Sequence, residues 1–426
     1  MLEEHRITEL DSGVRVVTER MPSVRSVALG FWIGTGSAGE AEPEAGLSHL
    51  IEHMLFRGTA RFESVEIDQI FDGMGAELNA GTGKETTSVY SRVLDVHLER
   101  ALDVMADMVW RPRFAQSDLD NEREIVLEEI AMYEDDPQDK VFDVLGEAVF
   151  GSHPLGRAII GRAEVVAGTP AEGLRTFYDA RYVPRNIVVS AAGSLDHDEL
   201  VEQIAAAEAA RTSAPVPPAL AAPVDELERR IRFIEKDTEQ YHLCLGGPGI
   251  PRHDERRFAL RVLDNILGGS SSSRLFQEVR EKRGLAYSVY SFQSLYAGTG
   301  QVGMYVGTRP DNVGRAMAVV ADELERFRLE PATPEELDRS KENVKGRLVL
   351  ALESTTARMN RLGSSLLAEL PLLSVDEMVE RIDAVTIEDL EGLARELFVP
   401  ERLSAAGIGA DRAVFDAALE PLGAAA

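Results

Sequence analysis

The chain has 426 residues, which is enough for two to four domains with complete hydrophobic cores. Its 73 acidic residues outnumber its 45 basic residues and give a formal net charge of −28, which argues against nucleic acid as a partner because phosphate contacts need lysine and arginine. No apolar run approaches the roughly 18 residues of a membrane-spanning helix, and the single cysteine, Cys244, excludes an internal disulfide framework.

The first predicted elements are two strands and a helix. The initial six residues lack the basic and apolar regions of a signal peptide, so we expect a soluble, cytoplasmic protein with no membrane partner. Residues 13–18 and 26–33 have the β-branched and apolar composition of strands, and apolar positions at helical spacing predict a helix over residues 45–56.

This helix contains the string His49-Leu-Ile-Glu52-His53, which has the form HxxEH. Two histidines at i and i+4 lie one turn apart on the same face, where neutral imidazoles can hold a zinc ion. Glu52 lies near that face and can take a proton from a water molecule that the metal activates. The order reverses the HExxH of common zinc proteases. The alternative is a helix that carries two surface histidines by chance, but its flanks are apolar, and buried polar groups need partners.

A catalytic zinc ion needs a third protein ligand, and the helix predicted over residues 119–136 offers several carboxylates. Glu122, Ile125 and Glu129 share one face of this helix, so one carboxylate could bind zinc while the other orients a ligand or tunes the water. A solvated acidic face is the alternative interpretation, and spacing alone does not separate Glu128 from Glu129.

The second half of the chain repeats the first. Short strings recur at an almost constant offset, as when Ser190-Ala-Ala-Gly193 returns as Ser404-Ala-Ala-Gly407. The proline-rich residues 211–225 predict a linker between a zinc-binding catalytic domain at 1–210 and a homologous domain without metal at 226–426, which contributes to substrate binding. Runs of strands followed by runs of helices favour an α+β fold with two similar tandem domains, each a mostly antiparallel sheet packed with helices.

The second half has lost the metal motif. Its corresponding helix, predicted over residues 256–267, places Arg261 near the position of His49 and Asn265 near that of His53, and these side chains cannot form a zinc site. The glycine-rich residues 246–249 and 268–269 lack the spacing of phosphate loops, and we interpret them as turn and substrate-cleft elements.

The string HLIEH, the glutamate 76 residues after its second histidine, and the string EEIAMYEDDP resemble the pitrilysin/insulinase metallopeptidases. They are most similar to the branch of mitochondrial processing peptidase and its bacterial relatives. The resemblance spans nearly the whole chain and implies that Glu129 is the third zinc ligand and Glu122 an accessory catalytic carboxylate.

The resemblance also implies substrate contacts. The string that begins at Glu77 resembles the strand that pairs with the substrate backbone in this family, which implies Asn79, Ala80 and Thr82 as substrate-binding residues. Many relatives have an aromatic residue at the position of Gly81.

In the second half, Arg280 and Tyr287 have the spacing of an arginine and a tyrosine that contact the substrate near the scissile bond in this family. Both are suitable donors to a peptide carbonyl. From the residues alone, an exposed basic loop and a core tyrosine are the alternative. Single-chain members of the family have four such domains, so a chain with two implies a clamshell-type homodimer, or a heterodimer with a related subunit.

We therefore predict a zinc-dependent endopeptidase, with one Zn²⁺ per chain, that cleaves peptides or unfolded, presequence-like segments bound in extended form within a chamber. His49, His53 and Glu129 hold the zinc ion, and Glu52 moves the proton from the attacking water to the leaving amine. The alternative is a non-catalytic scaffold or partner subunit of a processing-peptidase-like complex, in which metal motifs are usually broken. Here the motif is intact, and zinc content would separate the two.

Overall fold

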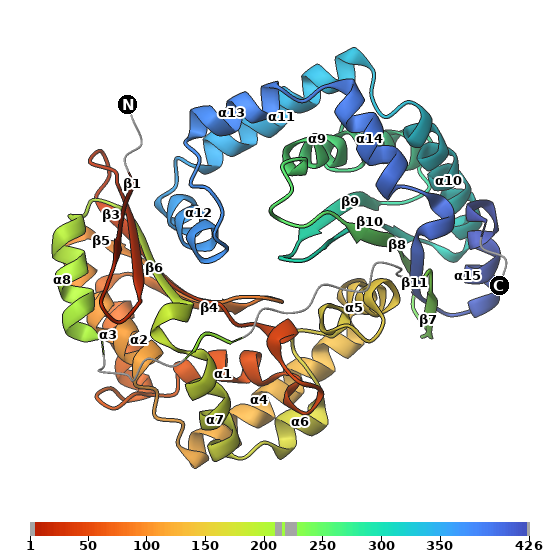
Figure 1. Cartoon of the computed structure of the whole chain (residues 1–426). Coiled ribbons are helices and arrows are strands. Elements are labelled where there is room, and N and C mark those ends of the chain that lie inside the picture. Colours follow the sequence, from red (N-terminus) through yellow and green to blue (C-terminus); the bar gives the residue numbers. More distant parts are fainter. Residues whose placement is uncertain (1–4, 209–214, 218–227, 424–426) are drawn as a thin grey trace. The chain divides into compact units, whose positions relative to one another are not determined.

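The computed structural model describes residues 5–208, 215–217 and 228–423, so most of the predicted linker at 211–225 lies outside the described residues. The described residues form two compact units (Figure 1). The first comprises those within Met1–Ile130, Ala158–Ala219 and Val349–Ser374, and the second those within Ala131–Arg157, Leu220–Leu348 and Val375–Ala426. In this part of the chain no helix has both the length and the apolar character needed to cross a membrane.

The first unit is built on a six-stranded sheet with the order β1-β2-β6-β3-β5-β4. The strands are β1 (His5–Glu9), β2 (Arg15–Arg20), β3 (Ser26–Ile33), β4 (Glu77–Thr82), β5 (Thr87–Leu94) and β6 (Ile187–Gly193). Neighbours are antiparallel except for β2 and β6, which run parallel. The predicted α+β class with a mostly antiparallel sheet is confirmed, and β4 lies at one edge with β5 as its partner in the sheet.

Strand β3 is free of polar side chains from Val27 to Ile33, where both of its faces are buried. Leu29 and Phe31 point to one face and Trp32 to the other, as the two-residue period of a strand requires. The first face packs against a core formed with α1 (Leu47–Leu55), α2 (Ser64–Met74), α3 (Leu98–Trp110), most of α4 (Gln116–Asp135), α6 (Ala163–Gly168), α7 (Ala171–Arg181) and α8 (His197–Ala207).

The second face of this sheet is covered by α12 (Thr355–Leu367), a helix from the other half of the sequence (Figure 1). Met359 of α12 is fully buried against β2, β3 and β6. The buried carboxylate of Glu19, on β2, accepts hydrogen bonds from Arg358 and Arg361 of the same helix, with 3.0 Å to Arg361 Nη2. Apolar packing and a buried ion cluster therefore both hold α12 on the sheet.

The second unit repeats this plan with a five-stranded sheet of order β7-β11-β8-β10-β9. The strands are β7 (Ile231–Glu235), β8 (Tyr241–Gly249), β9 (Ser288–Leu295), β10 (Gly300–Thr308) and β11 (Ser404–Gly409). Here β7 and β11 form the parallel pair, just as β2 and β6 do in the first unit, and β9 takes the edge position of β4. The predicted duplication of the fold is thus visible in the strand order.

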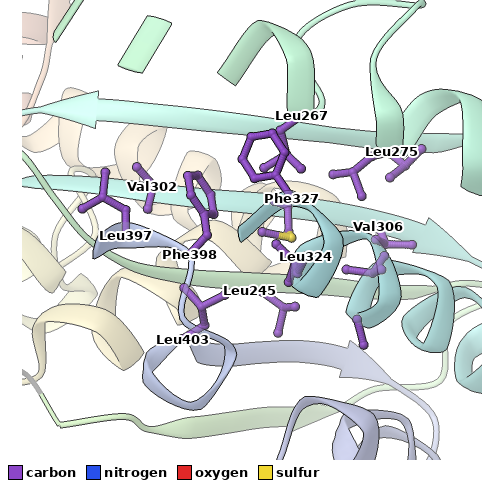
Figure 2. Packing of buried hydrophobic residues seen from close by; sticks show 14 of the residues in the cluster. Leu245, Leu267, Leu275, Val302, Val306, Leu324, Phe327, Leu397, Phe398 and Leu403 are labelled. Atoms are coloured by element: carbon purple, nitrogen blue, oxygen red, sulfur yellow. The ribbon is translucent and has the colours of Figure 1, made fainter. Parts of the chain in front are cut away.

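The core of the second unit lies between its sheet and a layer of helices (Figure 2). Phe327 and Phe398 meet edge to face with ring centroids 5.5 Å apart, and Leu245 and Val302 reach this core from β8 and β10. The helices are α9 (Arg257–Leu267), α10 (Val313–Leu329), most of α11 (Pro334–Ala351), α13 (Val375–Asp383), α14 (Ile387–Leu397) and α15 (Arg412–Leu419).

The other face of the second sheet receives α5 (Pro137–Phe150), which comes from the first half of the sequence (Figure 1). Phe142 of α5 stacks on Tyr305 of β10 with ring centroids 5.7 Å apart. Helices α5 and α12 occupy equivalent places in the two units. The two halves of the sequence therefore exchange equivalent helices, a feature absent from the sequence-based division at residues 211–225.

The interpretation of the glycine-rich residues 246–249 as a turn is wrong. Gly246 and Gly249 do not form a turn, because both lie within β8 and pair with β10. A Cβ atom at Gly246 would lie 2.9 Å from the backbone oxygen of Val302 on β10 and 3.0 Å from the Leu145 side chain of α5. Glycine therefore suits a position that is crowded both by the neighbouring strand and by the exchanged helix.

Candidate metal centre

Helix α1 brings His49 and His53 together on one face. Their rings lie with centroids 4.6 Å apart, and the two Nε2 atoms are 3.2 Å apart. The opposite face of the helix, with Leu50 and Ile51, is completely buried in the core of the first unit and fixes the direction of the histidines. The N-terminus of α1 is also anchored, because the buried carboxylate of Glu40 accepts hydrogen bonds from the backbone of the first turn at 2.7 and 2.8 Å.

Helix α4 supplies the third member of this group, Glu129. Its Oε2 lies 3.4 Å from His53 Nε2 and 3.7 Å from His49 Nε2, and these three residues form a group able to hold a metal ion. Atoms bound at about 2.0–2.2 Å to a tetrahedral zinc ion lie about 3.3–3.6 Å from one another. The donor set and its spacing therefore fit zinc, with shifts of only a few tenths of an ångström. Glu128, which the sequence did not separate from Glu129, is exposed and outside this group.

Glu122 lies one layer deeper on the same face of α4. Its Oε1 is 2.9 Å from His53 Nδ1, and its Oε2 accepts a hydrogen bond from Arg57 Nε. Burial alone would raise the pKa of Glu122, but its bonds to His53 and Arg57 outweigh burial and lower that pKa. A carboxylate at this position accepts the proton of Nδ1 and leaves Nε2 of His53 as the atom available to a metal.

The two histidines have opposite tendencies to ionise. Burial, with a smaller contribution from the neighbouring His53, lowers the pKa of His49 to about 4. Burial also opposes a charge on His53, but the hydrogen bond and charge of Glu122 outweigh it and raise the pKa of His53. His49 is therefore neutral at ordinary pH, and its Nδ1 has no hydrogen-bond partner within the described residues.

Glu52 lies between the two histidines in the sequence but is outside the group of candidate ligands. Its Oε2 accepts a hydrogen bond from the hydroxyl of Thr82 on β4. Burial raises the pKa of Glu52, and this effect outweighs the opposing hydrogen bond of Thr82. Glu52 thus has a higher proton affinity than an ordinary glutamate, which suits a general base.

The edge strand β4 carries the residues expected to bind substrate. Asn79 and Gly81 are exposed, whereas Ala80 and Thr82 are half-buried and Thr82 contacts Glu52. A Cβ atom at Gly81 would meet nothing within 4 Å, so the space beside this position is open. The sequence interpretation missed that Thr82 orients the candidate base.

Arg280 and Tyr287 lie together in the second unit. The Arg280 guanidinium lies over the ring of Tyr287 at 4.5 Å and over that of Phe276 at 4.7 Å. Tyr287 is 77% exposed, so the alternative of a core tyrosine is wrong. The pair is therefore preassembled on the surface of its unit.

The second unit also joins one helix to its edge strand by a hydrogen bond. Asp264 on α9 accepts it from Ser291 of β9, whose place in the sheet corresponds to that of Leu78 rather than Thr82 on β4. The amide oxygen of Asn265, also on α9, accepts a hydrogen bond from the hydroxyl of Ser340 of α11 at 2.9 Å. The placement of Asn265 at the position of His53 stays a prediction.

Comparison with known proteins agrees with this geometry. Two family models match the chain: Insulinase (Peptidase family M16) over residues 15–163, and Peptidase M16 inactive domain over residues 170–344. A protein of Streptomyces coelicolor named uncharacterized zinc protease is 43% identical over 92% of this chain and 87% of its own length. The uncharacterized zinc protease YmxG of Bacillus subtilis is 42% identical over 92% and 95%. A crystal structure titled peptidase M16 inactive domain from Pseudomonas fluorescens has the same fold, with a TM-score of 0.89, 24% identity and coverage of 96% and 98%.

Proposed function

This chain belongs to the insulinase family of peptidases, family M16, and from that premise we propose that it is a zinc-dependent endopeptidase. Its relatives are named zinc proteases, which supports a metallopeptidase, and the intact His-His-Glu group supports zinc as the metal. The observation that carries the proposal is the mutual spacing of 3.2, 3.4 and 3.7 Å between the donor atoms of His49, His53 and Glu129.

Each residue of the centre has a chemical task in the proposed reaction. His49, His53 and Glu129 would hold the zinc ion through two Nε2 atoms and one carboxylate oxygen. When bound, zinc polarises a peptide carbonyl and lowers the pKa of a water molecule. Glu52 takes the proton of the attacking water on a carboxylate oxygen and delivers it to the nitrogen of the leaving amine. Thr82 keeps the other oxygen of that carboxylate engaged, so the base is oriented before substrate arrives.

The proposed substrates are peptides or unfolded, presequence-like segments bound in extended form. Support comes from β4, whose free edge offers backbone donors and acceptors to an added strand. Asn79 and Ala80 would contact this segment, and Thr82 links the strand to the candidate base. Enclosure of the segment in a chamber and a cytoplasmic location are parts of the same proposal.

Metal analysis combined with peptide cleavage tests the proposal. We expect one zinc ion per purified chain, cleavage of internal bonds in a peptide library, loss of cleavage after chelation, and recovery when zinc is returned. A chain with no stoichiometric zinc would favour the alternative, a non-catalytic scaffold or partner subunit. Release of single terminal residues would retain a peptidase but contradict the endopeptidase assignment.

We further propose that the active form is a dimer, with itself or with a related subunit, in which Arg280 and Tyr287 serve the zinc centre of the opposite chain. The exposed Tyr287 and the half-buried Arg280 beside it support this, because donors at the surface of a unit can reach a substrate held elsewhere. A mixture of two inactive chains, Glu52→Gln and Tyr287→Phe, should regain part of the activity, since mixed dimers contain one complete site. Tagged chains would verify that subunits exchange. Exchange without recovery would contradict the arrangement in trans.

A further inference from the structure

One arginine is linked to the metal centre through Glu122. Arg57 follows His53 by four residues, just beyond the end of α1 at Leu55. Its Nε donates a hydrogen bond to Glu122 Oε2, and the other oxygen of the same carboxylate is 2.9 Å from His53 Nδ1. A continuous path of hydrogen bonds therefore runs from Arg57 to a candidate zinc ligand.

The burial of these groups differs along the path. The Glu122 side chain is 3% exposed and that of Arg57 is 37% exposed. Glu122 is thus almost shielded from water, and each of its two oxygens has one protein partner, His53 or Arg57. A buried carboxylate that loses one such partner would turn toward solvent or toward its remaining donor. Either movement would change the contact with His53.

The backbone explains how Arg57 is held in place. Its N–H donates to the carbonyl of Met54 at 3.2 Å, and its own carbonyl accepts a hydrogen bond from Arg113 at 3.3 Å. The next residue, Gly58, has φ of +105°, which ends the helical path and which a residue with a side chain rarely adopts. The backbone of Arg57 is therefore fixed by hydrogen bonds, and its guanidinium extends from a defined turn.

We propose that Arg57 is a positioning residue of the metal centre: it fixes Glu122, which in turn holds the His53 ring with Nε2 directed at the metal. The inference deepens the proposed function and rests on its zinc site. Groups that orient metal ligands typically change metal affinity or activity by about 10- to 100-fold. Arg57→Gln is therefore expected to weaken zinc binding by about that factor, and Arg57→Lys by less, because lysine keeps the charge but not the planar donor group.

A double-mutant cycle tests the path. Zinc dissociation constants, measured against a competing chelator, are compared for the wild type, Arg57→Gln, Glu122→Gln and the double variant. Because Arg57 acts through Glu122, the double variant should bind zinc no more weakly than Glu122→Gln alone. Unchanged zinc affinity in Arg57→Gln, or fully additive losses in the double variant, would overturn the inference. A wild-type chain that binds no zinc would instead overturn the proposed function, and this inference with it.

Arg61→Gln is the matched control. Arg61 lies four residues further along and pairs at 3.2 Å with the fully buried Asp107, which also pairs with Arg111. This variant removes a nearby guanidinium from a buried carboxylate that has no part in the metal centre, so its zinc affinity should stay at the wild-type value. Equal loss of affinity in Arg61→Gln and Arg57→Gln would mean that general loosening of this region, rather than the path through Glu122, is responsible.

Discussion

Replacing Glu52 with glutamine should remove the catalytic base without removing the zinc ion. Glu52 is outside the His49, His53 and Glu129 group, and its Oε2 accepts a hydrogen bond from Thr82, whose hydroxyl can also donate to an amide oxygen. The amide has nearly the shape of the carboxylate but cannot accept the proton of water. General-base catalysis is worth roughly 10²–10⁴-fold in rate. We therefore expect kcat to fall by that factor, or about 3–5 kcal/mol of transition-state stabilisation.

The assay measures kcat with saturating peptide, together with zinc content and secondary structure. Glu128→Gln is the control, because this exposed glutamate on α4 also loses one charge near the centre. It should keep both zinc and activity. A Glu52→Gln chain with full zinc and activity near that of the wild type would refute Glu52 as the base. Loss of zinc together with activity would assign Glu52 to metal binding instead.

Three further results are expected. Glu129→Gln should weaken zinc binding far more than Glu128→Gln, and equal zinc retention would place the third ligand elsewhere. Zinc affinity should rise about tenfold per pH unit from about pH 5 to above pH 6.5 and then level off. In this pH range His53, whose pKa is raised, still carries a proton that competes with zinc, whereas His49, with a pKa of about 4, is already neutral. A rise in zinc affinity of about a hundredfold per pH unit, which means that two protons are released, would contradict this. Glu19→Gln should speed hydrogen exchange in α12 and lower the free energy of unfolding by roughly 3–5 kcal/mol, because it breaks a buried ion cluster. Unchanged exchange would show that Glu19 does not anchor α12.

The parts of the centre that lie on one helix could be predicted from the sequence. The spacing of His49 and His53 sets their common face as soon as the segment is helical, and the apolar residues between them set which face is buried. The helical period of α4 likewise places Glu122 and Glu129, seven residues apart, on one face. Choosing Glu129 over Glu128 required either the resemblance or the distances, because both residues lie in one turn and only packing decides which carboxylate points inward.

Contacts between elements far apart in the sequence could not be predicted. The hydrogen bond from Thr82 to Glu52 depends on which strand lies at the edge of the sheet beside α1. No local sequence pattern indicates the order of the strands in the sheet. The link from Arg57 to Glu122 depends on a turn at Gly58 beyond the end of the helix. Arg57 does stand at i+4 from His53, and that spacing was the one available signal.

The exchange of α5 and α12 was hidden for a different reason. The two halves descend from one pattern, so a helix from either half has an apolar face that suits the second face of either sheet. Composition and periodicity are therefore the same for an exchanged and an unexchanged arrangement. What distinguishes them is close packing at individual positions, such as Gly246 under α5, and pairs such as Glu19 with the two arginines of α12.

The second unit shows which contacts of the metal centre do not depend on metal. The contact of Asn265 with Ser340 ties α9 to α11 with neutral groups, just as His53 and Glu122 tie α1 to α4 with groups of opposite charge tendency. In each unit a side-chain contact therefore joins two helices, with a candidate metal ligand in the first unit and with neutral groups in the second. Glu122 therefore has two effects: it joins α1 to α4, and its charge and hydrogen bond raise the pKa of His53. In the second unit an amide and a hydroxyl join α9 to α11, so this contact between helices needs no metal ligand.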